Sequence, residues 1–122
     1  MPHKRDPRYL PEQGCNGVQR ACTDLLTVHR IWWMRCNSVV FQGQNGHKYR
    51  AGQKGMADVL MTPHICDKCP VSVPVWCEFK STSGKQTDFQ KAFQAEVEKA
   101  GHLYLLINDP QQLIDWLKEF LH

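Results

Sequence analysis

The second half of the chain changes its hydrophobic period twice, and this pattern constrains the fold most. Residues 73–79 (VPVWCEF) are rich in β-branched and aromatic side chains and predict a strand. After the turn STSG, apolar residues fall on one helical face at Phe89, Phe93, Val97 and Ala100. The run HLYLLIN then predicts a strand buried on both faces. Because such a strand–helix–strand unit crosses over right-handedly, its two strands should be parallel.

Local signals mark the ends of the predicted helices. Thr87 and Gln90 have capping-box spacing at the start of the middle helix, and Gly101 provides a left-handed stop at its end. Asp109 and Pro110 read as an N-cap and first helical residue. They open a last helix whose apolar face contains Leu113, Leu117 and Phe120.

The first half predicts one helix followed by strands. The first helix is predicted from apolar positions that follow helical spacing, which are Val18, Cys22, Leu25, Leu26 and His29. Residues 30–41 (RIWWMRCNSVVF) predict a strand pair or a strand and a bend, whereas residues 42–55 (QGQNGHKYRAGQKG) predict a flexible, positively charged loop. Residues 56–61 (MADVLM) predict a further strand, which a Pro- and Cys-rich connection joins to residues 73–79.

The order helix, strands, helix, strand, helix predicts an α/β domain with a small mixed β-sheet flanked by helices. A chain of 122 residues suits one domain, here residues 12–122, with residues 1–11 as a flexible basic N-terminal arm. We find no signal-peptide pattern and no apolar stretch of membrane-spanning length, so we expect a cytoplasmic protein. The formal net charge of +3 permits a phosphate-bearing partner.

Strand alternation brings charged residues together near the end of residues 73–79. Glu78 and Lys80 share one face, and Asp58 lies on the preceding predicted strand. If the two strands are neighbours, both carboxylates can bind Mg²⁺ or Mn²⁺, with the backbone carbonyl of Phe79 as a further ligand. Lys80 could then stabilise negative charge during phosphodiester hydrolysis. The competing interpretation is a solvated strand face with a cross-strand ion pair.

The segments GMADVL and CEFKSTSGKQTDFQ resemble the VRR-NUC (virus-type replication-repair nuclease) domain of the PD-(D/E)XK nuclease superfamily. The resemblance implies a restriction-endonuclease-like fold and metal-dependent cleavage of DNA. It implies that Asp58 and Glu78 bind the metal, that Lys80 is catalytic, and that Gln90 completes the site from the next helix. Gln90 has a second explanation as part of the capping box with Thr87.

The resemblance extends upstream to WMRCNS, where Arg35 and Asn37 match a family Arg-x-Asn motif implied in substrate contact or site support. Family members commonly carry a glutamate on the first helix, a few residues before a glutamine like Gln19. This chain reads GCNGVQ there, and Glu12 is the nearest acidic candidate. A contribution of the first helix to metal binding is therefore in question.

Stand-alone proteins of this type resemble viral and phage DNA-repair enzymes that act as homodimers on branched DNA, including four-way (Holliday) junctions. The resemblance therefore implies a junction-selective endonuclease in the cytoplasm of the host cell. An alternative keeps the chemistry but assigns flap, duplex or single-stranded DNA as the substrate. An alternative of another class is a non-catalytic nucleic-acid-binding module, with or without a structural zinc.

Six cysteines without an export signal are expected to be reduced thiols, with one pair as a possible zinc site. In HICDKC the zinc ligands would be His64, Cys66 and Cys69, completed by Cys77 or Cys36; the competing interpretation is thiols that pack a long hairpin. Basic residues expected to contact DNA phosphates at the rim of the site are Lys48, Arg50, Lys54 and Lys85.

Overall fold

The computed structural model describes residues 16–36, 39–64 and 71–120. The predictions for the N-terminal arm and for Glu12, Asn37, Cys66 and Cys69 lie outside these residues. The described elements follow the predicted order: α1 (Asn16–Val28), β1 (Trp32–Arg35), β2 (Val39–Gln42), β3 (Lys48–Ala51), β4 (Val59–Thr62), β5 (Val75–Phe79), α2 (Asp88–Lys99), β6 (Leu103–Ile107) and α3 (Pro110–Phe120). None of the described helices has the length and apolar character that crossing a membrane requires.

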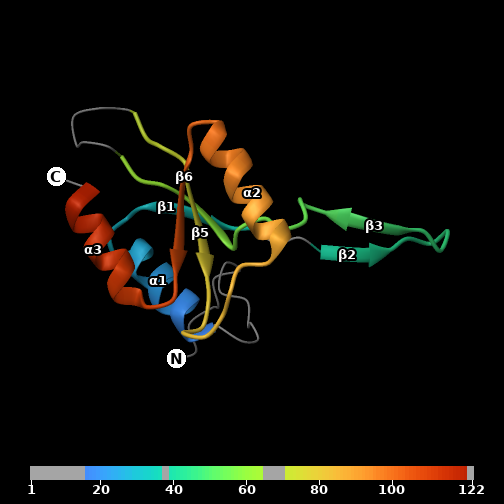
Figure 1. Ribbon diagram of the computed structural model, residues 1–122, viewed down its shortest axis with the longest axis horizontal. Coiled ribbons are helices and arrows are strands. Elements are labelled where there is room, and N and C mark those ends of the chain that lie inside the picture. The colour runs from blue at the N-terminus through green and yellow to red at the C-terminus, as the bar shows by residue number, and fades with distance from the viewer. Residues whose placement is uncertain (1–15, 37–38, 65–70, 121–122) are drawn as a thin grey trace, which may run out of the picture.

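The main sheet has the strand order β1-β4-β5-β6, with antiparallel pairing from β1 to β5. β5 and β6 pair in parallel, in the register that sets Phe79 beside Ile107, so the prediction from the strand–helix–strand unit is confirmed. In Figure 1, α2 lies on one side of β5 and β6, and α1 and α3 lie on the other. The domain is therefore a mixed α/β structure with a small mixed sheet flanked by helices, as predicted.

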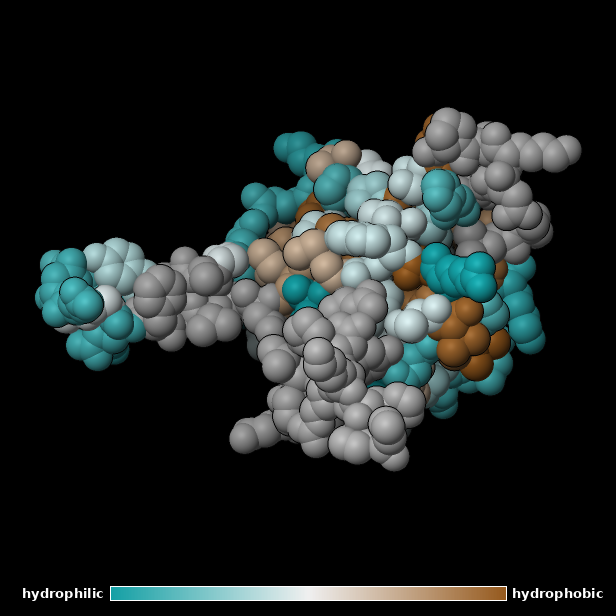
Figure 2. Space-filling view, turned by 180° about the vertical axis from the view of Figure 1, so that it is seen from behind, coloured by the Kyte–Doolittle hydropathy of each residue, from teal (hydrophilic) through white to brown (hydrophobic). Residues whose placement is uncertain are grey.

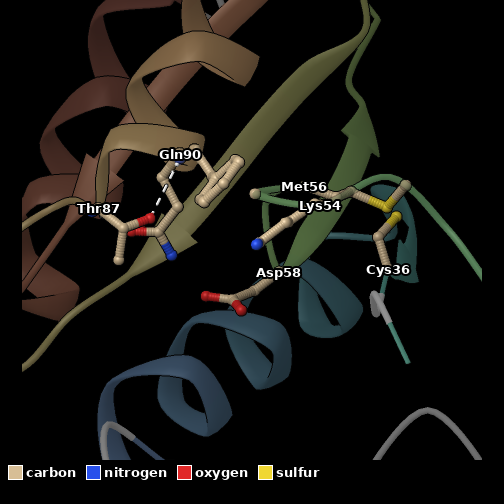
Figure 3. Close-up of a pocket in the computed structure, with 8 residues that line it drawn as sticks. Cys36, Lys54, Met56, Asp58, Thr87 and Gln90 are labelled. Carbon is tan, nitrogen blue, oxygen red and sulfur yellow. Dashed lines mark hydrogen bonds between the residues drawn. The ribbon is translucent and has the colours of Figure 1, made fainter. Parts of the chain in front are cut away.

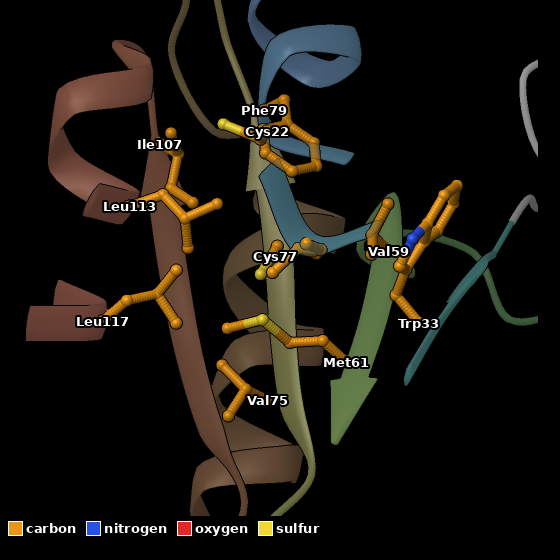
Figure 4. Packing of buried hydrophobic residues seen from close by; sticks show 11 residues of the cluster. Cys22, Trp33, Val59, Met61, Val75, Cys77, Phe79, Ile107, Leu113 and Leu117 are labelled. Atoms are coloured by element: carbon orange, nitrogen blue, oxygen red, sulfur yellow. The ribbon is translucent and has the colours of Figure 1, made fainter. Parts of the chain in front are cut away.

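The larger hydrophobic core lies between the sheet and the helices α1 and α3. Val75, Cys77 and Phe79 of β5 point into it and meet Leu113 and Leu117 of α3 (Figure 4). The alternation along β5 thus follows the prediction, because these residues occupy the face opposite to that of Trp76 and Glu78. Cys22, Cys36 and Cys77 are buried thiols, and burial raises the pKa of Cys22 to about 12.

A smaller core joins α2 to the opposite face of the sheet. Phe93 and Val97 are buried there against Ala57, and the Trp76 ring meets the Phe93 ring edge-on at 5.0 Å between centroids. The apolar face predicted for α2 is buried only in its middle. Phe89 is 52% exposed and Ala100 is also exposed, because only the middle of α2 rests on the sheet.

β6 differs from the prediction in its position. The apolar run HLYLLIN was expected to form a strand buried on both faces, but β6 is an edge strand of the sheet and Leu106 is 47% exposed. β6 closes the crossover from α2, so it pairs with β5 alone among the described strands. Composition alone does not separate an apolar edge strand from a central one.

The region predicted as a flexible loop contains half of a β-hairpin. β2 and β3 pair antiparallel, with Gln42 beside Lys48, and Gly46 adopts a φ of +80° in the turn. The two strands predicted within residues 30–41 exist, but β1 belongs to the main sheet and β2 to the hairpin. The hairpin extends away from the body of the domain (Figure 1), and its tip is hydrophilic (Figure 2).

Candidate active site

Asp58 and Glu78 come together through the pairing of β4 with β5. The register sets Val59 beside Cys77, so Asp58 and Glu78 are opposite each other on the α2 face of the sheet. The carboxylate Oδ2 of Asp58 accepts a 2.8 Å hydrogen bond from the backbone N–H of Phe79. The backbone carbonyl of Asp58 accepts a 2.7 Å bond from the N–H of Cys36. Asp58 is therefore fixed to strand β5 on one side and to the end of β1 on the other.

Glu78 carries a carboxylate that is almost completely buried. It is only 2% exposed, and its Oε1 accepts a 2.9 Å hydrogen bond from the side-chain amide of Gln90. The ammonium of Lys80 lies 3.6 Å from the same oxygen. The second oxygen, Oε2, is buried and has no hydrogen-bond partner among the described residues. A buried carboxylate oxygen without a partner is costly, so this atom marks a place for a ligand or a proton.

The two carboxyl groups are held in a state that favours a proton. Burial is the main cause, and together with the charge of Asp58 it raises the pKa of Glu78 to about 8. Burial also raises the pKa of Asp58, although the Phe79 N–H and the charge of Lys80 act in the opposite direction. The neighbouring carboxyl groups act in opposite directions: Asp58 raises the pKa of Glu78, whereas Glu78 lowers that of Asp58, so a proton is favoured on Glu78. Without a cation, the pair therefore shares a proton at neutral pH.

Gln90 contacts both the capping residue Thr87 and the carboxylate of Glu78. Its Oε1 accepts a 2.9 Å bond from the Thr87 N–H, and its own N–H donates to Thr87 Oγ1 at 3.2 Å, which completes the capping box of α2. Its Nε2 donates to Glu78. The two explanations are compatible because one amide carries both an acceptor and a donor.

The charges of Lys80 and Arg35 act on the carboxylate pair. The charge of Lys80 lowers the pKa of both carboxyl groups, and the charge of Arg35 lowers that of Asp58. The backbone N–H of Lys80 donates to the carbonyl of Ile107 at 2.9 Å, which ties this residue to β6. The Lys80 ammonium thus lies beside Glu78, as the prediction that the two residues share one face of the strand requires.

A pocket of about 380 Å³ opens next to Asp58, where the loop before β4 meets the first turn of α2. Its walls come from Cys36, Lys54, Met56, Asp58, Phe89 and Gln90. In Figure 3 the Lys54 ammonium, the Asp58 carboxylate and the Gln90 amide point into this pocket from three sides. Met56 and Phe89 were not identified as site residues from the sequence, and Cys36 was named only as a possible zinc ligand.

Gly55 is the sequence signal that could have revealed this pocket. It adopts a φ of +81°, which L side chains rarely adopt. A Cβ at this position would collide with the backbone carbonyl of Phe89 and lie 2.8 Å from the N of Gln90. The glycine therefore allows the loop to approach the start of α2 and bring Lys54 to Phe89.

The predicted DNA-contacting residues are separated in space. Lys54 is at the pocket, and Lys85 is exposed in the turn between β5 and α2. Lys48 is exposed on β3 near the tip of the hairpin, and Arg50 follows it on the same strand. The prediction that residues 42–55 form a single basic loop at the rim of the site is therefore wrong, because Lys48–Ala51 is strand β3 of the projecting hairpin.

Of the proposed zinc ligands, the structure describes His64, Cys36 and Cys77. His64 is exposed and forms a bridge with Ser72, whereas Cys36 and Cys77, its proposed completions, are buried. Within residues 16–36, 39–64 and 71–120, no three His, Cys, Asp or Glu side chains are grouped so that they could hold a metal ion. In α1, Gln19 is buried and Asp24 is exposed, so the described helix adds no carboxylate to the pair.

Comparison with protein-family models, curated proteins and solved structures found no match to this chain. The family resemblance therefore stays a prediction.

Proposed function

We propose that this protein is a divalent-metal-dependent DNA endonuclease that hydrolyses phosphodiester bonds at the Asp58–Glu78 pair. The observation that carries the proposal is Glu78, whose buried Oε2 has no hydrogen-bond partner among the described residues and belongs to a carboxyl group beside that of Asp58. Two buried carboxylates close together repel each other unless a proton or a cation lies between them. Retaining such a pair is expensive, which favours a functional role.

The donor atoms suit a hard cation such as Mg²⁺ or Mn²⁺. Glu78 Oε2 is unpartnered, and Asp58 Oδ2 is oriented by the Phe79 N–H. The Phe79 carbonyl, between Glu78 and Lys80 in the chain, is a further oxygen donor. Mg²⁺ typically takes one or two carboxylates and keeps several waters, so two acidic residues are sufficient. When bound, the cation would neutralise phosphate charge and make a water molecule more acidic.

The neighbouring residues have roles that follow from their contacts. The Lys80 ammonium, 3.6 Å from Glu78, is positioned to stabilise negative charge that develops on the phosphate. Gln90 holds Oε1 of Glu78, so that Oε2 keeps a fixed direction. The charge of Arg35 favours the ionised form of Asp58. Together these residues form a preorganised site with two anionic and two cationic side chains.

The finer assignments rest on the sequence resemblance. We infer a restriction-endonuclease-like fold of the VRR-NUC type, to which the mixed sheet and the Asp58, Glu78-x-Lys80 and Gln90 arrangement conform. We infer branched DNA, including four-way junctions, as the substrate and a homodimer as the active form, since a two-fold dimer presents two sites to two strands. Sedimentation equilibrium tests the dimer: a mass of 14.1 kDa for the active protein would contradict it.

A cleavage panel tests the activity. Labelled four-way junction, flap, duplex and single-stranded DNA are each incubated with the protein in Mn²⁺, in Mg²⁺ and in EDTA. We expect cleavage only with metal, and the preferred substrate chooses among the nuclease alternatives. Lys80→Met should be inactive, whereas Lys118→Met, which removes an exposed lysine on α3, should cut normally. DNA binding without cleavage of any substrate would favour the non-catalytic module.

A further inference from the structure

The pocket beside Asp58 has features that the proposed cleavage reaction does not use. Phe89 is 52% exposed although it shares a helical face with the buried residues Phe93 and Val97. The ammonium of Lys54 lies 3.7 Å from the centroid of its ring. An exposed aromatic ring with a cation over it is a common arrangement for binding nucleic acid, because the ring stacks on a base while the cation meets a phosphate.

The pocket is continuous with the carboxylate pair. Asp58 forms part of its wall, and so does Gln90, which is hydrogen-bonded to Glu78. A phosphate held at the carboxylate pair would therefore place its neighbouring nucleoside at or near this pocket. The remaining wall contains Cys36 and Met56, whose sulfur-containing side chains offer a polarizable apolar surface.

The size of the pocket limits what can enter. Its volume of about 380 Å³ is near the lower end of the range for small-ligand sites and suits one nucleoside. A base that is paired and stacked in a duplex would first have to be extruded, which is least costly for a base that is already unpaired. The pocket therefore favours an unpaired nucleotide.

The wall of the pocket is held in place by contacts between distant segments. Gln53 donates a 2.6 Å hydrogen bond to Glu96 on α2, and Gly55 lies against the backbone of Phe89 and Gln90. Lys54, between these two anchors, is thereby held over Phe89. A preformed wall reduces the entropy cost of binding a base.

From these features we propose that the Phe89–Lys54 pocket binds an unpaired base of the DNA strand next to the scissile phosphate. The base stacks on the part of the half-exposed Phe89 ring that Lys54 does not cover, and Lys54 contacts the adjoining phosphate. The inference rests on the proposed function, since it uses the carboxylate pair to locate the phosphate. Within branched DNA, the pocket would then recognise an unpaired nucleotide next to the scissile phosphate.

Binding assays without cleavage test this site. Two fluorescent duplexes are compared in EDTA by anisotropy: one has a single unpaired adenine, and the other has an abasic residue at the same place. We expect the wild-type protein to bind the unpaired adenine about tenfold more tightly, the range for stacking of one base on an aromatic ring. Phe89→Ala should bind both duplexes equally, and Phe89→Tyr should keep the preference. Thermal unfolding checks that both variants are folded.

Trp32→Ala is the matched control. Trp32 is 55% exposed, similar to Phe89, but it lies at the opposite end of β1 from Cys36. This variant should keep the preference for the unpaired adenine. If Trp32→Ala abolishes the preference as Phe89→Ala does, the effect comes from general surface hydrophobicity and the proposal is wrong.

Other results would also overturn the proposal. Equal binding of both duplexes by the wild-type protein would remove the base-binding site. Displacement of the adenine duplex by an equal concentration of free dAMP would assign the pocket to free nucleotides. A dimer that Phe89→Ala converts to monomers would assign the ring to a contact between two copies. Because no cleavage is measured, a base preference without nuclease activity would support the pocket and contradict only the proposed function.

Discussion

The side-chain amide of Gln90 donates a 2.9 Å hydrogen bond to Oε1 of Glu78, while its oxygen accepts the N–H of Thr87. One side chain thus connects the cap of α2 to the buried carboxylate of β5. The start of α2 and the direction of the Glu78 carboxylate are consequently coupled. The stability of the helix and the geometry of the carboxylate pair can nevertheless be separated by substitution, because the Thr87 hydroxyl accepts the Gln90 N–H whereas the Gln90 amide contacts Glu78.

The first prediction compares Thr87→Ala with Gln90→Glu. Thr87→Ala removes the capping hydroxyl and should lower the free energy of unfolding by about 1 kcal/mol without loss of activity. Gln90→Glu keeps an acceptor for the Thr87 N–H but sets a third carboxylate against Glu78, so cleavage should fall strongly while the cap is retained. Urea unfolding and cleavage rates measure the two effects. Equal activity losses in both variants would contradict the separation.

The second prediction concerns pH in the absence of metal. The pKa of Glu78 is raised from 4.5 to about 8 in the folded protein, so between these values the folded protein binds more protons than the unfolded chain. Stability should therefore fall as pH rises through this window. Relative to Glu78→Gln, which carries no titrating proton there, the loss should reach about 1.4 kcal/mol per pH unit. Urea unfolding in EDTA from pH 5 to 8.5 gives the comparison, and parallel curves for the two proteins would refute it.

The third prediction concerns metal addition above the pKa of Glu78. At pH 8.5 Mn²⁺ should stabilise the wild-type protein, because it would neutralise two carboxylates that have lost their shared proton. Saturation at a hundredfold excess over the dissociation constant corresponds to about 2.7 kcal/mol. Thermal unfolding with and without Mn²⁺ measures the shift. Glu78→Gln should lose it and Asp115→Asn, which changes an exposed carboxylate on α3, should not.

The fourth prediction compares two glycines with the same backbone conformation. Gly55 and Gly46 have φ values of +81° and +80°, but a Cβ meets the backbone of Phe89 only at Gly55 and finds nothing within 4 Å at Gly46. Both alanine substitutions should carry the cost of a left-handed residue, about 1 kcal/mol. Gly55→Ala should cost more and should also reduce cleavage, since it moves the loop that carries Asp58. Equal stability and activity in the two variants would mean that the contact does not position the site.

Much of the second half of the fold was predictable because its signals are local. The alternation of Glu78 and Lys80 with Phe79, the Thr87–Gln90 spacing and Gly101 each act within a few residues. The crossover rule then fixed the parallel pairing of β5 with β6. The closeness of Asp58 to Glu78 needed one further assumption, that β4 and β5 are neighbours, and the structure confirms that pairing.

The features that the sequence did not reveal depend on contacts between distant segments. The glycines around Lys48 and Arg50 resemble those of a loop, and only pairing with β2 makes a strand there. The exposure of Leu106 follows from the place of β6 at the sheet edge. Phe89 has the helical spacing of a core residue, but the loop at Gly55 lies against its backbone and leaves the ring at the pocket. Hydrophobic periodicity reports only local spacing, so it cannot predict these contacts between distant segments.

Cleavage by the wild-type protein and by Asp58→Asn tests the central claim most directly. Asparagine keeps the side-chain oxygen that accepts the Phe79 N–H, so the fold is preserved while the charge is removed. Single-turnover cleavage of the preferred DNA is measured in Mn²⁺, with Asp115→Asn as the control. The account predicts metal-dependent cutting by the wild-type and control proteins and a loss of at least about a hundredfold in Asp58→Asn. Undiminished cutting by a folded Asp58→Asn protein would contradict it.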